Sequence, residues 1–244
     1  MSTSLLININ NSFTKAAIWN GSRLRPMGRI TSPQIKTTDF KNWITQARPQ
    51  QILIASVVPS VTQKFKAPVS IPCYQLNHTS PWGIQIEFPR PSSIGADRLA
   101  NAAGVNAFYS VPAVVIDYGT AVTFDIISKR GEYLGGVITP GMRVFQDYLA
   151  ERTALLPRVK VSRPDQVVGK STRSAMLSGA YYGYRGLVKE ILREIKQELH
   201  VKRLAIIATG GDSKLFQHEA DLFDTHDPDL SFKGMSVVAD HYLS

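Results

Sequence analysis

The stretch Ala-Val-Val-Ile-Asp-Tyr-Gly-Thr-Ala-Val-Thr at residues 113–123 decides the fold of this chain. Its first four residues are apolar and mostly β-branched, which predicts a buried strand that ends at Asp117. Residues 122–128 predict a second strand, which returns alongside the first. An aspartate at a strand end presents a carboxylate, and Gly119 lets a phosphate approach the backbone. An ordinary hairpin, in which the glycine only forms the turn, is the alternative.

The N-terminal half of the chain repeats this pattern. Residues 5–10 predict a buried strand, residues 14–19 predict its returning partner, and Asn8 matches the place of the aspartate. Hydrophobic spacing predicts further strands at 51–58, 84–88, 133–138 and 203–208, and helices at 39–47, 94–108, 171–199 (with a candidate break around 183–186) and 235–243. Strand meanders that alternate with helices indicate an α/β fold with two related lobes, 1–112 and 113–244, and a cleft between them.

The composition is that of a globular protein. Of the 244 residues, 43% are hydrophobic and 19% are charged. The single cysteine, Cys73, cannot form an internal disulfide, and no apolar stretch approaches the ~20 residues of a membrane span. Residues 1–14 have asparagines within their apolar stretch and no basic segment, unlike a signal peptide. These features predict a cytoplasmic protein that does not associate with a membrane.

The chain is basic, with a net charge of +9. A basic protein can bind nucleic acid, an acidic membrane face or small anions. Here the lysines and arginines are scattered, without a basic block or interleaved aromatic residues. Nucleic acid is therefore not the expected partner, and a basic surface without a ligand is the simpler interpretation. Metal-ligand spacing is absent from the five histidines, which are His78, His200, His218, His226 and His241.

Two further clusters carry residue types suited to chemistry. Residues 95–98, Gly-Ala-Asp-Arg, open a predicted helix, where Asp97 could accept a proton from a hydroxyl and Arg98 could bind a carboxylate. The alternative is a helix-start acid beside a surface arginine. The Thr-Gly-Gly turn at 209–211 follows a predicted strand and could bind an anion, although such junctions are common. Lys15 could neutralise phosphate or simply be solvated. The sequence contains no Walker P-loop.

Several segments match the motifs of one family, in the same order along the chain. They are residues 55–59 (ASVVP), 95–102 (GADRLANA), 115–125 (VIDYGTAVTFD), 133–141 (YLGGVITPG), 155–157, 171–172, 178–179, 183, 209–211 and 229–235. Through them the sequence resembles the type III pantothenate kinases, members of the acetate kinase, sugar kinase, Hsp70 and actin superfamily. The resemblance spans nearly the whole chain, and the combination of motifs at these spacings is highly specific.

The resemblance implies a fold of two ribonuclease-H-like lobes and a homodimer with pantothenate near the dimer interface. It implies phosphorylation of pantothenate by ATP with Mg²⁺ and a monovalent cation, K⁺ or NH₄⁺. In this reading Asp97 is the general base, and Asp117 holds the monovalent cation. The implied substrate-binding positions are Phe88, Gly95, Arg98 and Thr172. The implied ATP and phosphate positions are Asn8 (which also stands on the Mg²⁺ side), Asn11, Ser12, Lys15, Thr120, Thr209, Gly210 and Gly211.

The sequence departs from the family's first phosphate motif at two positions. Asn8 stands where an aspartate normally helps hold the metal-bound phosphate, and Asn10 stands where a glycine normally lies. Phe88 replaces a frequent tyrosine, so one substrate hydrogen bond is absent. An amide can ligate through its carbonyl but brings no charge to offset Mg²⁺. These departures leave two alternatives open: a non-catalytic or weakened family member that acts as a binding or regulatory protein, and a kinase for another small hydroxy acid.

Overall fold

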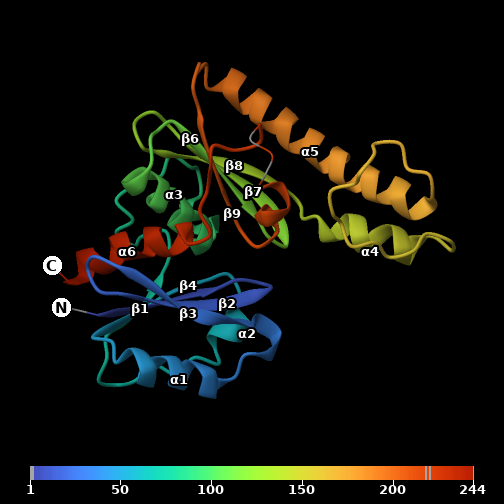
Figure 1. Cartoon of the computed structure of the whole chain (residues 1–244). Helices are drawn as coiled ribbons and strands as arrows, with labels where there is room; N and C mark the ends of the chain where they lie inside the picture. The colour runs from blue at the N-terminus through green and yellow to red at the C-terminus, as the bar shows by residue number, and fades with distance from the viewer. Residues whose placement is uncertain (1–2, 218, 220, 244) are drawn as a thin grey trace. The chain divides into compact units, whose positions relative to one another are not determined.

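The computed structural model describes residues 3–217, 219 and 221–243, so that His218 lies outside the described residues. The chain forms two compact units. Unit 1 comprises Met1–Ala113, Asp125–Gly135 and Pro228–Ser244, and unit 2 comprises Val114–Phe124 and Gly136–Asp227. Each predicted lobe contributes the strands of one five-stranded sheet (Figure 1). The α/β class is confirmed, while the division of the chain at 112 and 113 stays a prediction.

The first sheet has the strand order β3-β2-β1-β4-β5. Its strands are β1 (Ser4–Ile9), β2 (Phe13–Trp19), β3 (Leu24–Thr31), β4 (Gln51–Ser56) and β5 (Cys73–Leu76). Strand β1 is antiparallel to β2 and parallel to β4, and every one of its residues is buried. Helix α1 (Thr37–Ala47) contributes Phe40 and Trp43 to the core on one face of this sheet. Because side chains alternate between the two faces of a strand, the complete burial of β1 means that both of its faces are covered, which fits its mostly apolar sequence.

Two helices of unit 1 pack at very short range through glycines. They are α3 (Ala96–Phe108) and α6 (Leu230–Leu243). A Cβ atom on Gly234 would overlap the carbonyl oxygen of Ala100, and one on Gly104 would lie 2.7 Å from the carbonyl oxygen of Leu230. Since a side chain at either position would force the helix backbones apart, this contact requires glycine on both helices.

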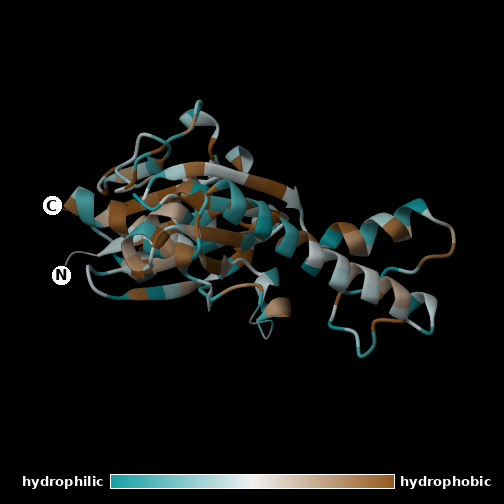
Figure 2. Ribbon diagram, turned by 90° about the horizontal axis from the view of Figure 1, so that it is seen from above, coloured by the Kyte–Doolittle hydropathy of each residue, from teal (hydrophilic) through white to brown (hydrophobic). Residues whose placement is uncertain are grey.

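The second sheet has the strand order β10-β9-β6-β7-β8. Its strands are β6 (Ala113–Tyr118), β7 (Ala121–Ile127), β8 (Tyr133–Pro140), β9 (Ala205–Thr209) and β10 (Thr225–His226). Figure 2 shows hydrophobic residues along the strands as well as on the helices. Asp117 is the fifth residue of β6, as Asn8 is the fifth residue of β1. The predicted repeat of a buried strand, a polar position and a returning strand is therefore confirmed.

The remaining elements are short connections and two further long helices. They are η1 (Ser32–Gln34), α2 (Pro59–Thr62), η2 (Pro91–Ser93), α4 (Arg143–Arg152), α5 (Thr172–Glu198) and η3 (Asp212–Phe216). Helix α5 is continuous, so the candidate break around 183–186 does not occur. Its glycines there are exposed, and a glycine in a helix costs only about 1 kcal/mol relative to alanine. Among the described residues, no helix is long and apolar enough to cross a bilayer.

The predicted strand at 84–88 is wrong. Only an isolated parallel bridge between Ile86 and Tyr133 forms there. Glu87 donates its backbone N–H to the Tyr133 carbonyl, and Tyr133 donates to the carbonyl of Gln85. The prolines at 89 and 91 prevent the ladder from continuing, because proline has no N–H to donate. The segment therefore lies against the start of β8 without becoming a strand of its sheet.

Candidate active site

Helix α3 begins with the Gly-Ala-Asp-Arg segment identified in the sequence. Gly95 is the N-cap, and Asp97 lies in the first turn, where a carboxylate is stabilised by the helix dipole. The Arg98 backbone N–H donates to Oδ1 of Asp97 over 2.9 Å. A Cβ atom on Gly95 would lie 2.5 Å from that same oxygen and 3.1 Å from Cγ1 of Val57. Glycine at position 95 therefore leaves the space that the Asp97 carboxylate occupies.

The Arg98 side chain forms an ion pair with Asp125 inside unit 1. Nε of Arg98 lies 2.7 Å from Oδ1 of Asp125, whose side chain is completely buried. The Tyr133 hydroxyl donates to the same carboxylate oxygen over 3.0 Å. The guanidinium carbon also lies 5.9 Å from the centre of the Tyr133 ring, within the range of a cation–π contact. Arg98 is thus held by two residues from β7 and β8.

Burial and charge act in opposite directions on this cluster. Burial raises the pKa of Asp125 to about 7, although the charge of Arg98 and the Tyr133 hydrogen bond partly offset this rise. Burial alone would lower the pKa of Arg98, but the attraction of Asp125 outweighs it and the net shift is upward. Nη2 of Arg98 is buried and has no hydrogen-bond partner among the described residues. A donor left in this state is suited to a ligand oxygen.

Phe88 lies beside the same cluster. Its ring centre is 6.5 Å from that of Tyr133, at an interplanar angle of 61°. Gly135 faces the same ring, and a Cβ atom there would lie 3.3 Å from Phe88 carbons. Four positions predicted for substrate or proton transfer, Phe88, Gly95, Asp97 and Arg98, therefore gather in unit 1. The fifth, Thr172, is the exposed first residue of α5 in unit 2, where Ser171 caps the helix.

The predicted phosphate positions of unit 1 follow the β1–β2 turn. Asn8 pairs with Lys15 across the two antiparallel strands, so both side chains project from the same face of the sheet. Asn8 is 2% exposed, and its Oδ1 atom has no hydrogen-bond partner among the described residues. Oδ1 of Asn10 is in the same state. Asn11 is exposed and Ser12 is half-buried in the turn between the strands.

The predicted positions of unit 2 lie at the ends of β6 and β9. Gly210 has φ +89°, and a Cβ atom there would lie 2.5 Å from both Oδ1 of Asp117 and the Tyr118 carbonyl oxygen. Glycine at this position therefore lets the β9 turn approach the Asp117 carboxylate. Thr209 is buried at the end of β9, and Gly211 is exposed after it. Thr120 is exposed in the β6–β7 turn, and its carbonyl accepts the backbone N–H of Gly141 over 3.1 Å.

A pocket of about 750 Å³ lies in unit 2, and Gly211, the last residue of the Thr-Gly-Gly turn, contributes to its lining. Its lining residues are Met142, Arg143, Asp147, Arg158, Lys160, Val161, Gly211, Asp212, Lys214 and Leu215. The four cations outnumber the two carboxylates, so the pocket is suited to an anionic ligand. Burial raises the pKa of Asp212, and the charge of Arg143 opposes the rise. The sequence did not predict this pocket, because its residues come from α4, η3 and irregular segments that share no local motif.

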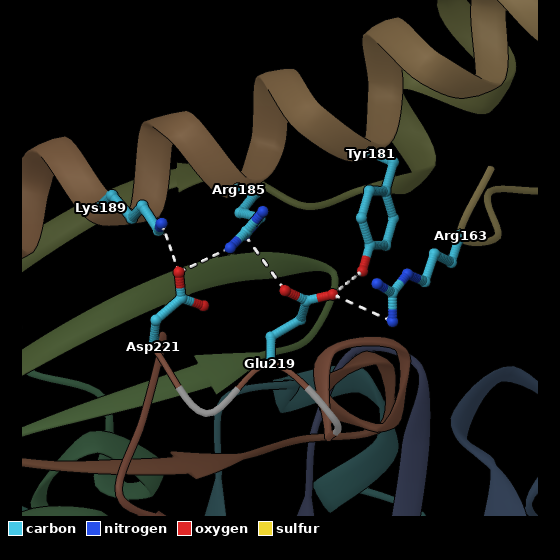
Figure 3. Close-up of polar contacts among 6 residues, drawn as sticks. All are labelled: Arg163, Tyr181, Arg185, Lys189, Glu219 and Asp221. Atoms are coloured by element: carbon cyan, nitrogen blue, oxygen red, sulfur yellow. Dashed lines mark hydrogen bonds and ion pairs between the residues drawn. The ribbon is translucent and has the colours of Figure 1, made fainter. Parts of the chain in front are cut away.

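An ion-pair network fixes α5 to the segment that follows η3 (Figure 3). Glu219 accepts the Tyr181 hydroxyl over 2.5 Å and pairs with Arg185 over 3.2 Å. Asp221 pairs with Arg185 over 2.6 Å and also with Lys189. Phe216, which is fully buried, stacks on Tyr184 and contacts Tyr118 and Tyr181 through rings 5.4–6.1 Å apart. These contacts fix the chain after the Thr-Gly-Gly turn relative to β6 and α5.

Two residues of the site were not predicted to act there. Asp125 and Tyr133 lie within quoted motifs, but neither motif alone indicates that they contact Arg98. The available signal was an aspartate between Phe124 and Ile126 in an otherwise apolar strand. A buried carboxylate in such a strand requires a partner. The described residues contain no group of three or more His, Cys, Asp or Glu side chains arranged to hold a metal ion.

Comparison with known proteins gives a consistent result. Residues 4–194 match the sequence model of the type III pantothenate kinases. The type III pantothenate kinase of Akkermansia muciniphila is 42% identical over 238 residues, which are 97% of this chain and 98% of that protein. A conserved Baf family protein of Campylobacter jejuni has a TM-score of 0.63 at 22% identity, with 98% of both chains covered. The ROK hexokinase of Thermus thermophilus has a TM-score of 0.54 at 10% identity, with 99% of this chain and 100% of that one covered. The two structures share the fold with this chain.

Proposed function

We propose that this chain, which belongs to the type III pantothenate kinase family, transfers the γ-phosphoryl group of ATP to the primary hydroxyl of pantothenate. This reaction opens the biosynthesis of coenzyme A. The observation that carries the proposal is the start of α3, where a carboxylate and a guanidinium with a buried, unpartnered Nη2 stand on adjacent residues. A substrate with a hydroxyl and a carboxylate matches these two groups.

Asp97 acts as the general base in this proposal. It takes the proton of the pantothenate hydroxyl while that oxygen forms a bond to the γ-phosphorus. The bond between the γ-phosphorus and its bridging oxygen breaks, and ADP leaves with the electron pair. Arg98 binds the carboxylate at the other end of pantothenate, with Gly95, Phe88 and Thr172 also on the substrate side. Such transfer depends mainly on alignment and charge neutralisation.

The phosphate side of the proposal begins with the turn between β1 and β2. In unit 1, Lys15 and the Asn11–Ser12 turn contact phosphate oxygens. The unpartnered Oδ1 atoms of Asn8 and Asn10 are neutral oxygen donors that fit a hard cation such as Mg²⁺. The ion, when bound with ATP, neutralises charge on the transferred group. Asn8 supplies no negative charge to it.

Unit 2 carries its own predicted nucleotide-binding positions. Thr120 and the Thr209–Gly211 turn contact the nucleotide, and the cationic pocket that begins at Gly211 takes its polar part. Asp117, beside Gly210, holds the monovalent cation, K⁺ or NH₄⁺. We also infer a homodimer in a reducing cytoplasm, which suits the single free cysteine Cys73.

The test is release of ADP by the purified protein with ATP, Mg²⁺ and K⁺, with and without pantothenate. We expect release that depends on pantothenate, and we expect Asp97→Asn to abolish it while pantothenate still binds by calorimetry. Retained turnover in Asp97→Asn would exclude the general-base role. A wild-type protein that binds pantothenate but releases no ADP would favour the non-catalytic alternative instead.

A further inference from the structure

Two nitrogens of the Arg98 guanidinium have different environments. Its Nε edge is occupied by Asp125, at 2.7 Å. The Tyr133 ring lies beside the guanidinium, with 5.9 Å between its centre and Cζ. Nη2 is buried but has no hydrogen-bond partner among the described residues. One edge of the group is therefore fixed by the protein, while a donor remains for a ligand.

Asp125 is the less expected member of this pair. It lies in β7 next to buried apolar residues, and none of its side chain is exposed. A carboxylate without a partner would be strongly disfavoured at such a position. Its Oδ1 atom accepts two hydrogen bonds, one from Arg98 and one from Tyr133. Both donors converge on one oxygen, so the carboxylate defines where the Arg98 Nε–H must point.

Tyr133 is itself held in place. Its backbone bridges to residues 85–87, and its ring contacts the Phe88 ring. The residue is fully buried. Because both its main chain and its ring are fixed, its hydroxyl offers a defined donor to Asp125 and its ring a defined neighbour to Arg98.

We propose that Asp125, supported by Tyr133, is a positioning residue that orients Arg98 to bind the carboxylate of the substrate. The inference rests on the proposed function, since it takes pantothenate as the ligand of Arg98. A guanidinium binds a carboxylate best through two parallel N–H groups in one plane. Asp125 holds Nε and thereby sets that plane before the substrate arrives, which reduces the ordering that binding requires.

The experiment compares two ligands by calorimetry: pantothenate and its alcohol analogue, in which the carboxylate is replaced by a hydroxymethyl group. The proteins are the wild type, Asp125→Asn and Tyr133→Phe. We expect Asp125→Asn to weaken pantothenate at least tenfold and to leave the alcohol within about twofold of its wild-type affinity. Tyr133→Phe should change pantothenate affinity in the same direction by a smaller factor. Asp240→Asn removes an exposed carboxylate of unit 1 and should change neither ligand.

The outcomes separate this inference from the proposed function. Failure of the wild type to bind pantothenate would remove the proposed function itself. Normal pantothenate binding by both variants, or an equal loss for both ligands, would overturn the positioning role. Circular dichroism and thermal unfolding check that each variant folds, and Tyr133→Phe, which keeps the ring, carries the test if Asp125→Asn does not fold.

Discussion

At the scale of single residues, Asn8 is a buried amide in β1, at a position where the family resemblance leads us to expect an aspartate. It faces Lys15 across the β1–β2 ladder, and its Oδ1 atom is buried without a partner among the described residues. An aspartate at this position would add a negative charge on the metal side of the proposed phosphate site. The buried charge would have Lys15 as its neighbour, so the exchange is tolerable where an isolated carboxylate would not be.

We therefore expect Asn8→Asp to lower the Mg²⁺ concentration that half-saturates nucleotide binding. We expect turnover at low Mg²⁺ to rise about tenfold, which corresponds to ~1.4 kcal/mol of activation free energy. Calorimetry with a non-hydrolysable ATP analogue gives the binding readout, independent of activity. Asn20→Asp adds the same charge in the turn after β2 and should change neither quantity. Unchanged Mg²⁺ dependence in Asn8→Asp would mean that the amide is sufficient.

Site residues could be predicted only where they lie in a recognised sequence motif. The segment 95–98 predicted both members of the α3 start, and the structure places them together. The contact of Arg98 with Asp125 could not be predicted, since 27 residues separate the two and no local rule specifies which strand faces a helix start. Phe88 could be named only through the family resemblance. Its packing on Tyr133 depends on the isolated bridge between Ile86 and Tyr133, which the sequence alone did not predict.

At the scale of helices and strands, the hydrophobic pattern of each segment decided whether it could be predicted. The strand at 113–116 is a continuous apolar run, and the one at 5–10 is interrupted only by asparagines; both form as expected. Strand β3 was missed because its residues, Leu-Arg-Pro-Met-Gly-Arg-Ile-Thr, include proline and glycine, and none of them is fully buried. It forms because β2 offers an open edge, with a register shift between Ala16 and Ala17 that accommodates the extra residue. Helix α6 begins at Leu230, five residues before the predicted start.

The α3–α6 contact makes a quantitative prediction at this scale. Gly234→Ala should destabilise the protein by about 1–3 kcal/mol, because the added methyl group meets the backbone of Ala100, which cannot move aside as a side chain can. Denaturant unfolding measures the loss. Gly186→Ala is the matched control, since no atom lies within 4 Å of its Cβ position and alanine favours a helix.

The expected stability of Gly186→Ala is equal to or slightly above that of the wild type. An equal loss in both variants would mean that the close approach of α3 to α6 does not determine the result. A stable Gly234→Ala protein would mean that the two helices can separate without cost. Gly104→Ala addresses the same contact from the other helix and should behave like Gly234→Ala.

At the scale of the molecule, the exposed hydrophobic residues are distributed unevenly. Unit 2 carries most of the large ones, which are Ile138, Val144, Tyr148, Leu155, Val167 and Val168. They belong to the end of β8, to α4 and to the segment between α4 and α5. Exposed apolar residues that gather in neighbouring segments are typical of an interaction surface. If the proposed homodimer forms, these residues make unit 2 the expected place of its contact.

The wild type should therefore sediment at twice the 27.0 kDa mass of the chain at micromolar concentration. Replacing Leu155 and Val168 by lysine should shift it towards the mass of a single chain, because charges on an apolar contact must be desolvated. Val69→Lys, which changes a fully exposed apolar residue of unit 1, should leave the dimer intact. A wild type that sediments as one chain at all concentrations would contradict the dimer.

The same variants connect assembly to function. Thr172 opens α5, directly after the segment that carries Leu155 and Val168, and it is exposed in the single chain. If Thr172 contacts pantothenate at the dimer contact, the double lysine variant should lose pantothenate affinity when it loses its partner chain. The α3 cluster, which lies wholly in unit 1, should stay folded in that variant. A monomer with full pantothenate affinity would place Thr172 outside the substrate site and leave Arg98 and its Asp125–Tyr133 support as sufficient for binding.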